Sequence, residues 1–123
     1  MSAILVIDDE KGLLQVIRQA LTQNGHHVET AADGNEGIRK FDDGRFDIVI
    51  TDIRMPGIDG NGVAAHIRKS SKKPIPVIAI SGTPWMLEQH AFDVVLPKPF
   101  PLQDLVESIK NILPSDQRIA AGS

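Results

Sequence analysis

Two groups of acidic residues, far apart in the sequence, each follow a short apolar run with the composition of a buried strand. Asp8 and Asp9 follow the run 3–7, and Asp52 follows the β-branched run 48–51. If these runs are neighbouring strands, three carboxylates meet and repel one another, and a divalent cation with oxygen ligands relieves that repulsion. The sequence therefore predicts a site for a hard cation, and Mg²⁺ is favoured because it needs few carboxylates and keeps several waters.

A hydroxyl group and an ammonium group follow two further apolar runs in the same way. Ser81 follows the run 77–80, and Lys98 follows the run 93–96 after one proline. Together with a cation, these two groups favour a phosphoryl group over a neutral substrate as the ligand. Phosphoryl transfer needs an aligned anionic oxygen and little proton chemistry, so the Asp52 carboxylate can act without a histidine base.

The chain turns soon after Asp52, at Met55-Pro56-Gly57, because proline cannot donate to a strand ladder and glycine adopts unusual backbone angles. Asp52 is therefore expected at the carboxyl end of a strand, where open α/β sheets bind their ligands. A second interpretation gives Asp52 a purely structural role, as a loop residue whose oxygens accept hydrogen bonds from backbone amides. The polar residues at three other strand ends favour the functional interpretation.

Apolar runs alternate with stretches of helical periodicity, which is typical of right-handed βαβ units and a parallel sheet with helices on both faces. We expect an α/β, flavodoxin-like, doubly wound sandwich with strand order 2-1-3-4-5 and a shortened or irregular fourth helix. The strands are predicted at 3–7, 27–31, 48–51, 77–80 and 93–96, and the helices at about 13–23, 33–41, 61–70, 83–90 and 101–113. Asp33 and Glu36 form the predicted capping box of the second helix.

Length and composition limit the classes of protein to consider. The 123 residues fit one domain, which we place at 1–114, with a polar tail at 115–123. The net charge is −3, from 13 basic and 16 acidic residues, so we expect no direct binding of nucleic acid or of a membrane. Because the sequence has no cysteine, no signal-peptide pattern and no membrane-spanning apolar run, we expect a cytoplasmic protein without disulfides.

Four motifs, in this order, resemble those of receiver domains of two-component response regulators. The resemblance covers essentially everything from Ala3 to Leu113. The motifs are Asp8-Asp9, Asp52-Ile53-Arg54-Met55-Pro56-Gly57-Ile58-Asp59-Gly60, Ser81-Gly82 and Lys98-Pro99-Phe100. The resemblance implies a stand-alone signalling protein rather than an enzyme with a separate substrate, although such a domain catalyses its own phosphorylation and dephosphorylation. Its implied partners are a sensor histidine kinase or a histidine phosphotransfer protein, and an unknown output protein.

The resemblance also implies a role for each polar residue of these motifs. Asp52 is expected to take the phosphoryl group, Ser81 to bond one of its oxygens, and Lys98 to pair with the phosphorylated Asp52. The Lys98-Pro99 bond is expected to be cis, which the small trans preference before proline allows.

The implied metal ligands include two of the three carboxylates. Asp9 and Asp52 are expected to bind Mg²⁺, or Mn²⁺, directly, together with the backbone carbonyl of Arg54. Asp8 is expected to hold a metal-bound water. The Arg54 side chain lies two positions beyond Asp52 and is predicted either to reach over the phosphoryl group or to be simply solvated.

The chain departs from the family pattern in how a signal could leave the site. Receivers usually carry an aromatic residue three positions before the lysine, but here that position is Val95. The segment 82–92 is also shorter than usual, so we predict that this segment itself, beginning at Gly82 and Thr83, is the switching element.

Two other functions remain open at this point. The first is a phosphorylation-independent, receiver-like module that binds proteins and whose acidic pocket is vestigial. The second is a metal-dependent phosphohydrolase that uses Asp52 as nucleophile. It is disfavoured because the position two residues beyond the nucleophile, where a second carboxylate would be needed, is Arg54.

Overall fold

The computed structural model of the chain describes residues 2–71, 73–83 and 91–113. Strands and helices alternate over residues 2–71, and two strands followed by one helix make up the rest of the described elements. The strands are β1 (Ala3–Ile7), β2 (His27–Ala31), β3 (Ile48–Asp52), β4 (Val77–Ser81) and β5 (Val94–Pro97). The helices are α1 (Lys11–Gln23), α2 (Gly34–Asp43), α3 (Gly60–Ser70) and α4 (Leu102–Ile112).

All five strands are parallel and lie in the order β2-β1-β3-β4-β5, which confirms the predicted fold class. This order places β1 beside β3 in the middle of the sheet, with Ile7 paired with Thr51. At the other pairings, Asp52 lies opposite Ile80, and Ser81 opposite Pro97. Because the strands run in one direction, their carboxyl ends meet at one rim of the sheet.

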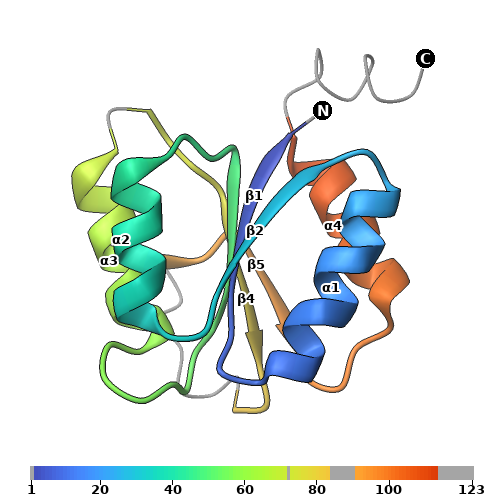
Figure 1. Ribbon diagram of the computed structural model, residues 1–123, viewed down its shortest axis with the longest axis horizontal. Coiled ribbons are helices and arrows are strands. Elements are labelled where there is room, and N and C mark those ends of the chain that lie inside the picture. The colour runs from blue at the N-terminus through green and yellow to red at the C-terminus, as the bar shows by residue number, and fades with distance from the viewer. Residues whose placement is uncertain (1, 72, 84–90, 114–123) are drawn as a thin grey trace.

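The sheet is covered on both faces, as Figure 1 shows, with α1 and α4 on one side and α2 and α3 on the other. Alternate strand residues enter the two layers, so that Ile4 packs toward α1 and α4 and Leu5 packs toward α2 and α3. Every residue of β3 and β4 is buried, which is why these strands have uninterrupted apolar runs in the sequence. The two cores hold the carboxyl rim in place from both sides.

Two side-chain caps fix the loops at this rim. Asp33 accepts a hydrogen bond from the backbone N–H of Glu36 at 2.7 Å, as the predicted capping box requires. The Glu36 carboxylate, however, accepts from the N–H of Ala32 at 2.6 Å, one residue before the N-cap. Asp59 caps α3 by accepting from the N–H of Gly62 at 2.9 Å, which ends the loop that follows β3.

Several expectations differ from the structure or fall outside it. β3, β4 and β5 each extend one residue beyond the predicted end because the ladder between them continues to the rim; one example is the 2.8 Å bond from Lys98 N–H to the Ser81 carbonyl. The predicted helix at 83–90 and the tail at 115–123 lie almost wholly outside the described residues. The Lys98-Pro99 bond is cis, as predicted. No helix in the described part of the chain has the length and apolar character needed to cross a membrane.

Candidate functional site

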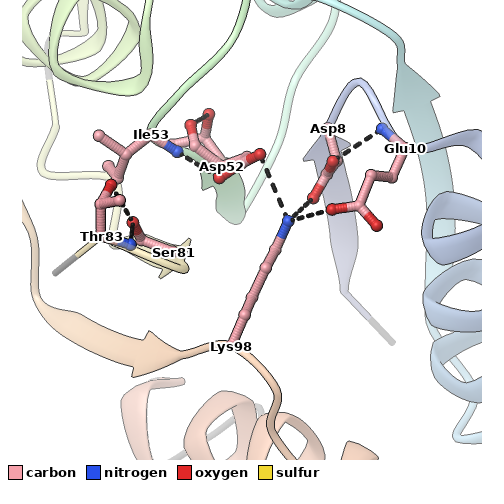
Figure 2. A network of polar contacts seen from close by, with 8 residues as sticks. Asp8, Glu10, Asp52, Ile53, Ser81, Thr83 and Lys98 are labelled. Atoms are coloured by element: carbon pink, nitrogen blue, oxygen red, sulfur yellow. Dashed lines mark hydrogen bonds and ion pairs between the residues drawn. The ribbon is translucent and has the colours of Figure 1, made fainter.

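The four polar strand ends of the sequence analysis meet at the carboxyl rim. Asp52 and Ser81 are the last residues of β3 and β4, and Asp8 and Lys98 directly follow β1 and β5. Figure 2 shows the Lys98 side chain extending from its strand end toward Asp8 and Asp52. Asp8 lies 90 positions and Asp52 lies 46 positions from Lys98 in the sequence, so the sheet order brings them together.

The three carboxylates predicted to meet do so. One oxygen from each of Asp8, Asp9 and Asp52 lies within 4.8 Å of the other two. Asp8 is completely buried and Asp52 is 6% exposed, whereas Asp9 is open to solvent. Carboxylate oxygens are the ligands that Mg²⁺ and Mn²⁺ prefer, and the exposed Asp9 leaves a path from solvent, so this group of donors fits a hard divalent cation.

Lys98 makes ionic contacts with three carboxylates at once. Its Nζ lies 3.0 Å from Asp8 Oδ2, 3.0 Å from Glu10 Oε1 and 3.3 Å from Asp52 Oδ2. The sequence paired Lys98 only with the phosphorylated Asp52, so its contact with Asp8 was not predicted. Neither was its contact with Glu10 (Figure 2). The only signal for it was the position of Glu10 as the third acid in the cluster after β1.

The electrostatics of the site follow from burial and from these contacts. Burial raises the pKa of the Asp8 carboxyl, while the Glu10 N–H and the Lys98 ammonium act in the opposite direction. Burial alone would lower the pKa of Lys98, but its hydrogen bonds with Glu10 and Asp8 and the nearby carboxylate charges raise it well above its usual range. Lys98 therefore stays protonated between these carboxylates.

The Asp52 carboxylate is held in a fixed orientation. Its Oδ1 accepts the backbone N–H of Ile53 at 2.7 Å, and its Oδ2 faces Lys98. Behind it, the start of α3 packs closely, because a Cβ added to Gly60 would lie only 2.3 Å from the Asp52 carbonyl oxygen. The alternative in which backbone amides satisfy the Asp52 oxygens is thus partly correct. One oxygen does accept a hydrogen bond from a backbone N–H, but the other faces the Lys98 ammonium group.

A cavity of about 350 Å³ opens beside Asp52. It is lined by Asp9, Glu10, Asp52, Arg54, Ser81, Gly82, Thr83 and Lys98. Ser81 Oγ accepts the N–H of Thr83 at 2.9 Å and lies 3.3 Å from the Thr83 hydroxyl, so two hydroxyl groups lie together at this wall (Figure 2). Val95 does not line the cavity. Val95 is 37% exposed, whereas its neighbours on β5, Val94 and Leu96, pack against the core.

Comparisons with known proteins agree with this arrangement. The sequence matches the response regulator receiver domain family over residues 4–110. The transcriptional regulatory protein TcrA of Mycobacterium tuberculosis is 34% identical over 112 residues, which cover 87% of this chain and 44% of TcrA. The chain spans about half the length of the curated relatives that it matches.

Two solved structures of one response regulator match over nearly the whole domain. Protein TrrA of Thermotoga maritima, in complex with Mg²⁺-BeF, is 37% identical with a TM-score of 0.84, covering 92% of this chain and 100% of TrrA. TrrA in complex with the histidine kinase ThkA matches with 35% identity and a TM-score of 0.83, covering 93% and 100% of the two chains. The family match, the sheet order and the residues at the rim lead to one conclusion: the chain belongs to the response regulator receiver domain family.

Proposed function

We propose that this domain accepts a phosphoryl group from a phosphohistidine onto Asp52, with Mg²⁺ bound, and signals to a protein partner by changing conformation. The observation that carries the proposal is the joint placement of its polar groups. Three carboxylates lie within 4.8 Å of one another, Lys98 contacts two of them, and Ser81 lines the adjoining cavity. An aspartate whose only role is to accept backbone hydrogen bonds would need neither the Lys98 ammonium group beside it nor the adjoining cavity.

Asp52 acts as the nucleophile in this proposal. One of its carboxylate oxygens attacks the phosphorus, the P–N bond of the phosphohistidine breaks, and the leaving imidazole nitrogen keeps the electron pair. The product is an acyl phosphate. Because the Ile53 N–H and Lys98 already orient the carboxylate, little ordering is left for the moment of reaction. The Lys98 ammonium and the Ser81 hydroxyl then interact with the phosphoryl oxygens.

The metal ion is assigned to the exposed side of the carboxylate group. Asp9 and Asp52 line the cavity and would bind Mg²⁺ or Mn²⁺ directly, with the Arg54 carbonyl as a third protein ligand. Asp8 is fully buried, and its two oxygens already accept the Glu10 N–H and the Lys98 ammonium, so an indirect role through water suits it better. When bound, the ion supplies positive charge to the oxygens of the transferring phosphoryl group.

The donor is proposed from the relative whose structure includes a kinase. TrrA has been solved in complex with the histidine kinase ThkA, and this chain is 35% identical to TrrA there. We therefore propose a sensor histidine kinase or a histidine phosphotransfer protein as the donor, in the cytoplasm, where kinases obtain ATP. The output partner is proposed to be a protein rather than nucleic acid, because the chain carries a net charge of −3.

One incubation tests this function against its alternatives. The domain is mixed with Mg²⁺ and acetyl phosphate, and both the intact mass of the protein and the released phosphate are followed with time. The proposal predicts a mass increase of one phosphoryl group that decays slowly. No increase would indicate a module that works without phosphorylation, and rapid release of many phosphates per protein would indicate a phosphohydrolase.

A further inference from the structure

Lys98 has as many carboxylate partners as it has hydrogens to donate. An ammonium group has three N–H donors, and Asp8, Glu10 and Asp52 each lie 3.0–3.3 Å from Nζ. A phosphoryl oxygen arriving on Asp52 needs one of these donors. The phosphoryl group brings three acceptor oxygens and takes over the negative charge of Asp52, so Lys98 can turn more than one donor toward it only by giving up Asp8 or Glu10.

The three partners differ in how easily they can be released. The Asp8 carboxylate is 0% exposed and would remain buried without its cation. Asp52 carries the phosphoryl group and stays beside Lys98. The Glu10 side chain is 62% exposed, so water can replace the lysine as its partner at little cost. We propose that Glu10 is a positioning residue that holds Lys98 in the unphosphorylated domain and releases it to the phosphoryl group.

The backbone of Glu10 keeps this side chain in place. Its N–H donates to Asp8 Oδ1 at 2.8 Å, and the residue is the N-cap of α1. Its side chain makes no capping hydrogen bond, so changing the carboxylate does not remove a cap from the helix. The effect of a substitution on Lys98 can therefore be measured without removing a capping hydrogen bond from α1.

This inference rests on the proposed function and predicts a direction of change. Because the Glu10 contact stabilises only the state without a phosphoryl group, its loss favours the other state. Without the contact, beryllofluoride, which stands in for the phosphoryl group, is expected to bind roughly two- to fivefold more tightly, the range of a largely exposed ion pair.

The experiment compares two substitutions that separate contact from charge. Glu10→Gln removes the charge, whereas Glu10→Asp keeps the charge but shortens the side chain by about 1.5 Å, one carbon–carbon bond, so that it no longer reaches Lys98. Beryllofluoride affinity is measured by calorimetry at saturating Mg²⁺, and Mg²⁺ affinity is measured separately. Both variants are expected to bind beryllofluoride more tightly than the wild type, and Glu10→Asp is expected to keep the wild-type Mg²⁺ affinity.

The remaining outcomes each overturn the inference. If Glu10→Asp binds beryllofluoride like the wild type while Glu10→Gln binds it more tightly, only the charge matters and Glu10 does not position Lys98. If the gain from Glu10→Gln persists in a Lys98→Ala background, the effect does not act through Lys98. If both variants bind beryllofluoride with the affinity of the wild type, this inference alone is refuted. If the wild type does not bind beryllofluoride in the presence of Mg²⁺, the proposed function is refuted as well.

Discussion

Gly60 is the residue at which a single methyl group is expected to disturb the site most directly. A Cβ on this residue would lie 2.3 Å from the Asp52 carbonyl oxygen and 2.9 Å from the Ile53 Cα, and real Cβ atoms essentially never approach closer than 3.0 Å. Both contacts are with backbone, so no side-chain rotation relieves them. Gly60→Ala must move either the start of α3 or the end of β3 by about 0.7 Å, the distance that separates 2.3 Å from 3.0 Å.

Two magnitudes follow from this shift. Overpacking of this kind costs about 1–3 kcal/mol of unfolding free energy, which urea denaturation measures. A displacement approaching 1 Å at the nucleophile costs up to about 10²-fold in rate, so phosphorylation by acetyl phosphate at saturating Mg²⁺ should slow by at least about tenfold.

Gly12 supplies the matched control for this substitution. It lies in α1, and a Cβ added there would meet nothing within 4 Å. Gly12→Ala should stabilise the domain by about 0.5 kcal/mol by restricting the unfolded chain, and should leave phosphorylation unchanged. A Gly60→Ala variant with the stability and rate of the wild type would refute the argument that α3 fixes the position of Asp52.

Three further predictions concern charge and metal binding. Lys98→Met should lower the unfolding free energy by about 2–3 kcal/mol without metal, because Asp8 and Asp52 lose their counter-charge, and added Mg²⁺ should restore part of it in urea titrations. Asp8→Ala should weaken Mg²⁺ binding about 10–100-fold in calorimetry, and Asp9→Ala should weaken it more, with the exposed Asp43→Ala as the control. The reverse order of the two affinities would contradict the assigned ligands. Burial lowers the pKa of His26, so the unfolded state binds its proton more readily, and stability should fall as the pH drops below about 6.5. His26→Gln should remove this part of the pH dependence of the unfolding free energy, which is a fraction of the ~1.4 kcal/mol per pH unit that one proton allows. If the unfolding free energy of the variant changes with pH as steeply as that of the wild type, His26 is not the source.

Much of the fold follows from local patterns in the sequence. The run of β1 is apolar at every position, and β3 begins with the apolar run Ile48-Val49-Ile50, because both faces of these strands are covered. Such runs are distinctive. Once the order of parallel strands is known, the meeting of Asp8, Asp52, Ser81 and Lys98 at one rim follows from geometry. The last residue of a strand is harder to predict, because it depends on the partner strand, as in the bond from Lys98 N–H to the Ser81 carbonyl.

Side-chain pairing at the rim could not be predicted in the same way. Glu10 and Lys98 are 88 residues apart, and an exposed glutamate can turn to any cation within its reach. The contact depends on the rotamers of two long side chains, which no periodicity encodes. The Glu36 carboxylate illustrates the same difficulty, because it accepts from Ala32 rather than from the N-cap residue.

Intact-mass measurement shows whether Asp52 is the residue that carries the phosphoryl group. Wild-type protein, Asp52→Asn and the control Asp43→Asn are incubated with Mg²⁺ and acetyl phosphate under identical conditions. The amide in Asp52→Asn is neither a nucleophile nor an anionic metal ligand, so this variant should gain no phosphoryl group, while the wild type and the control gain one. If Asp52→Asn gains the full phosphoryl mass at the wild-type rate, Asp52 is not the acceptor.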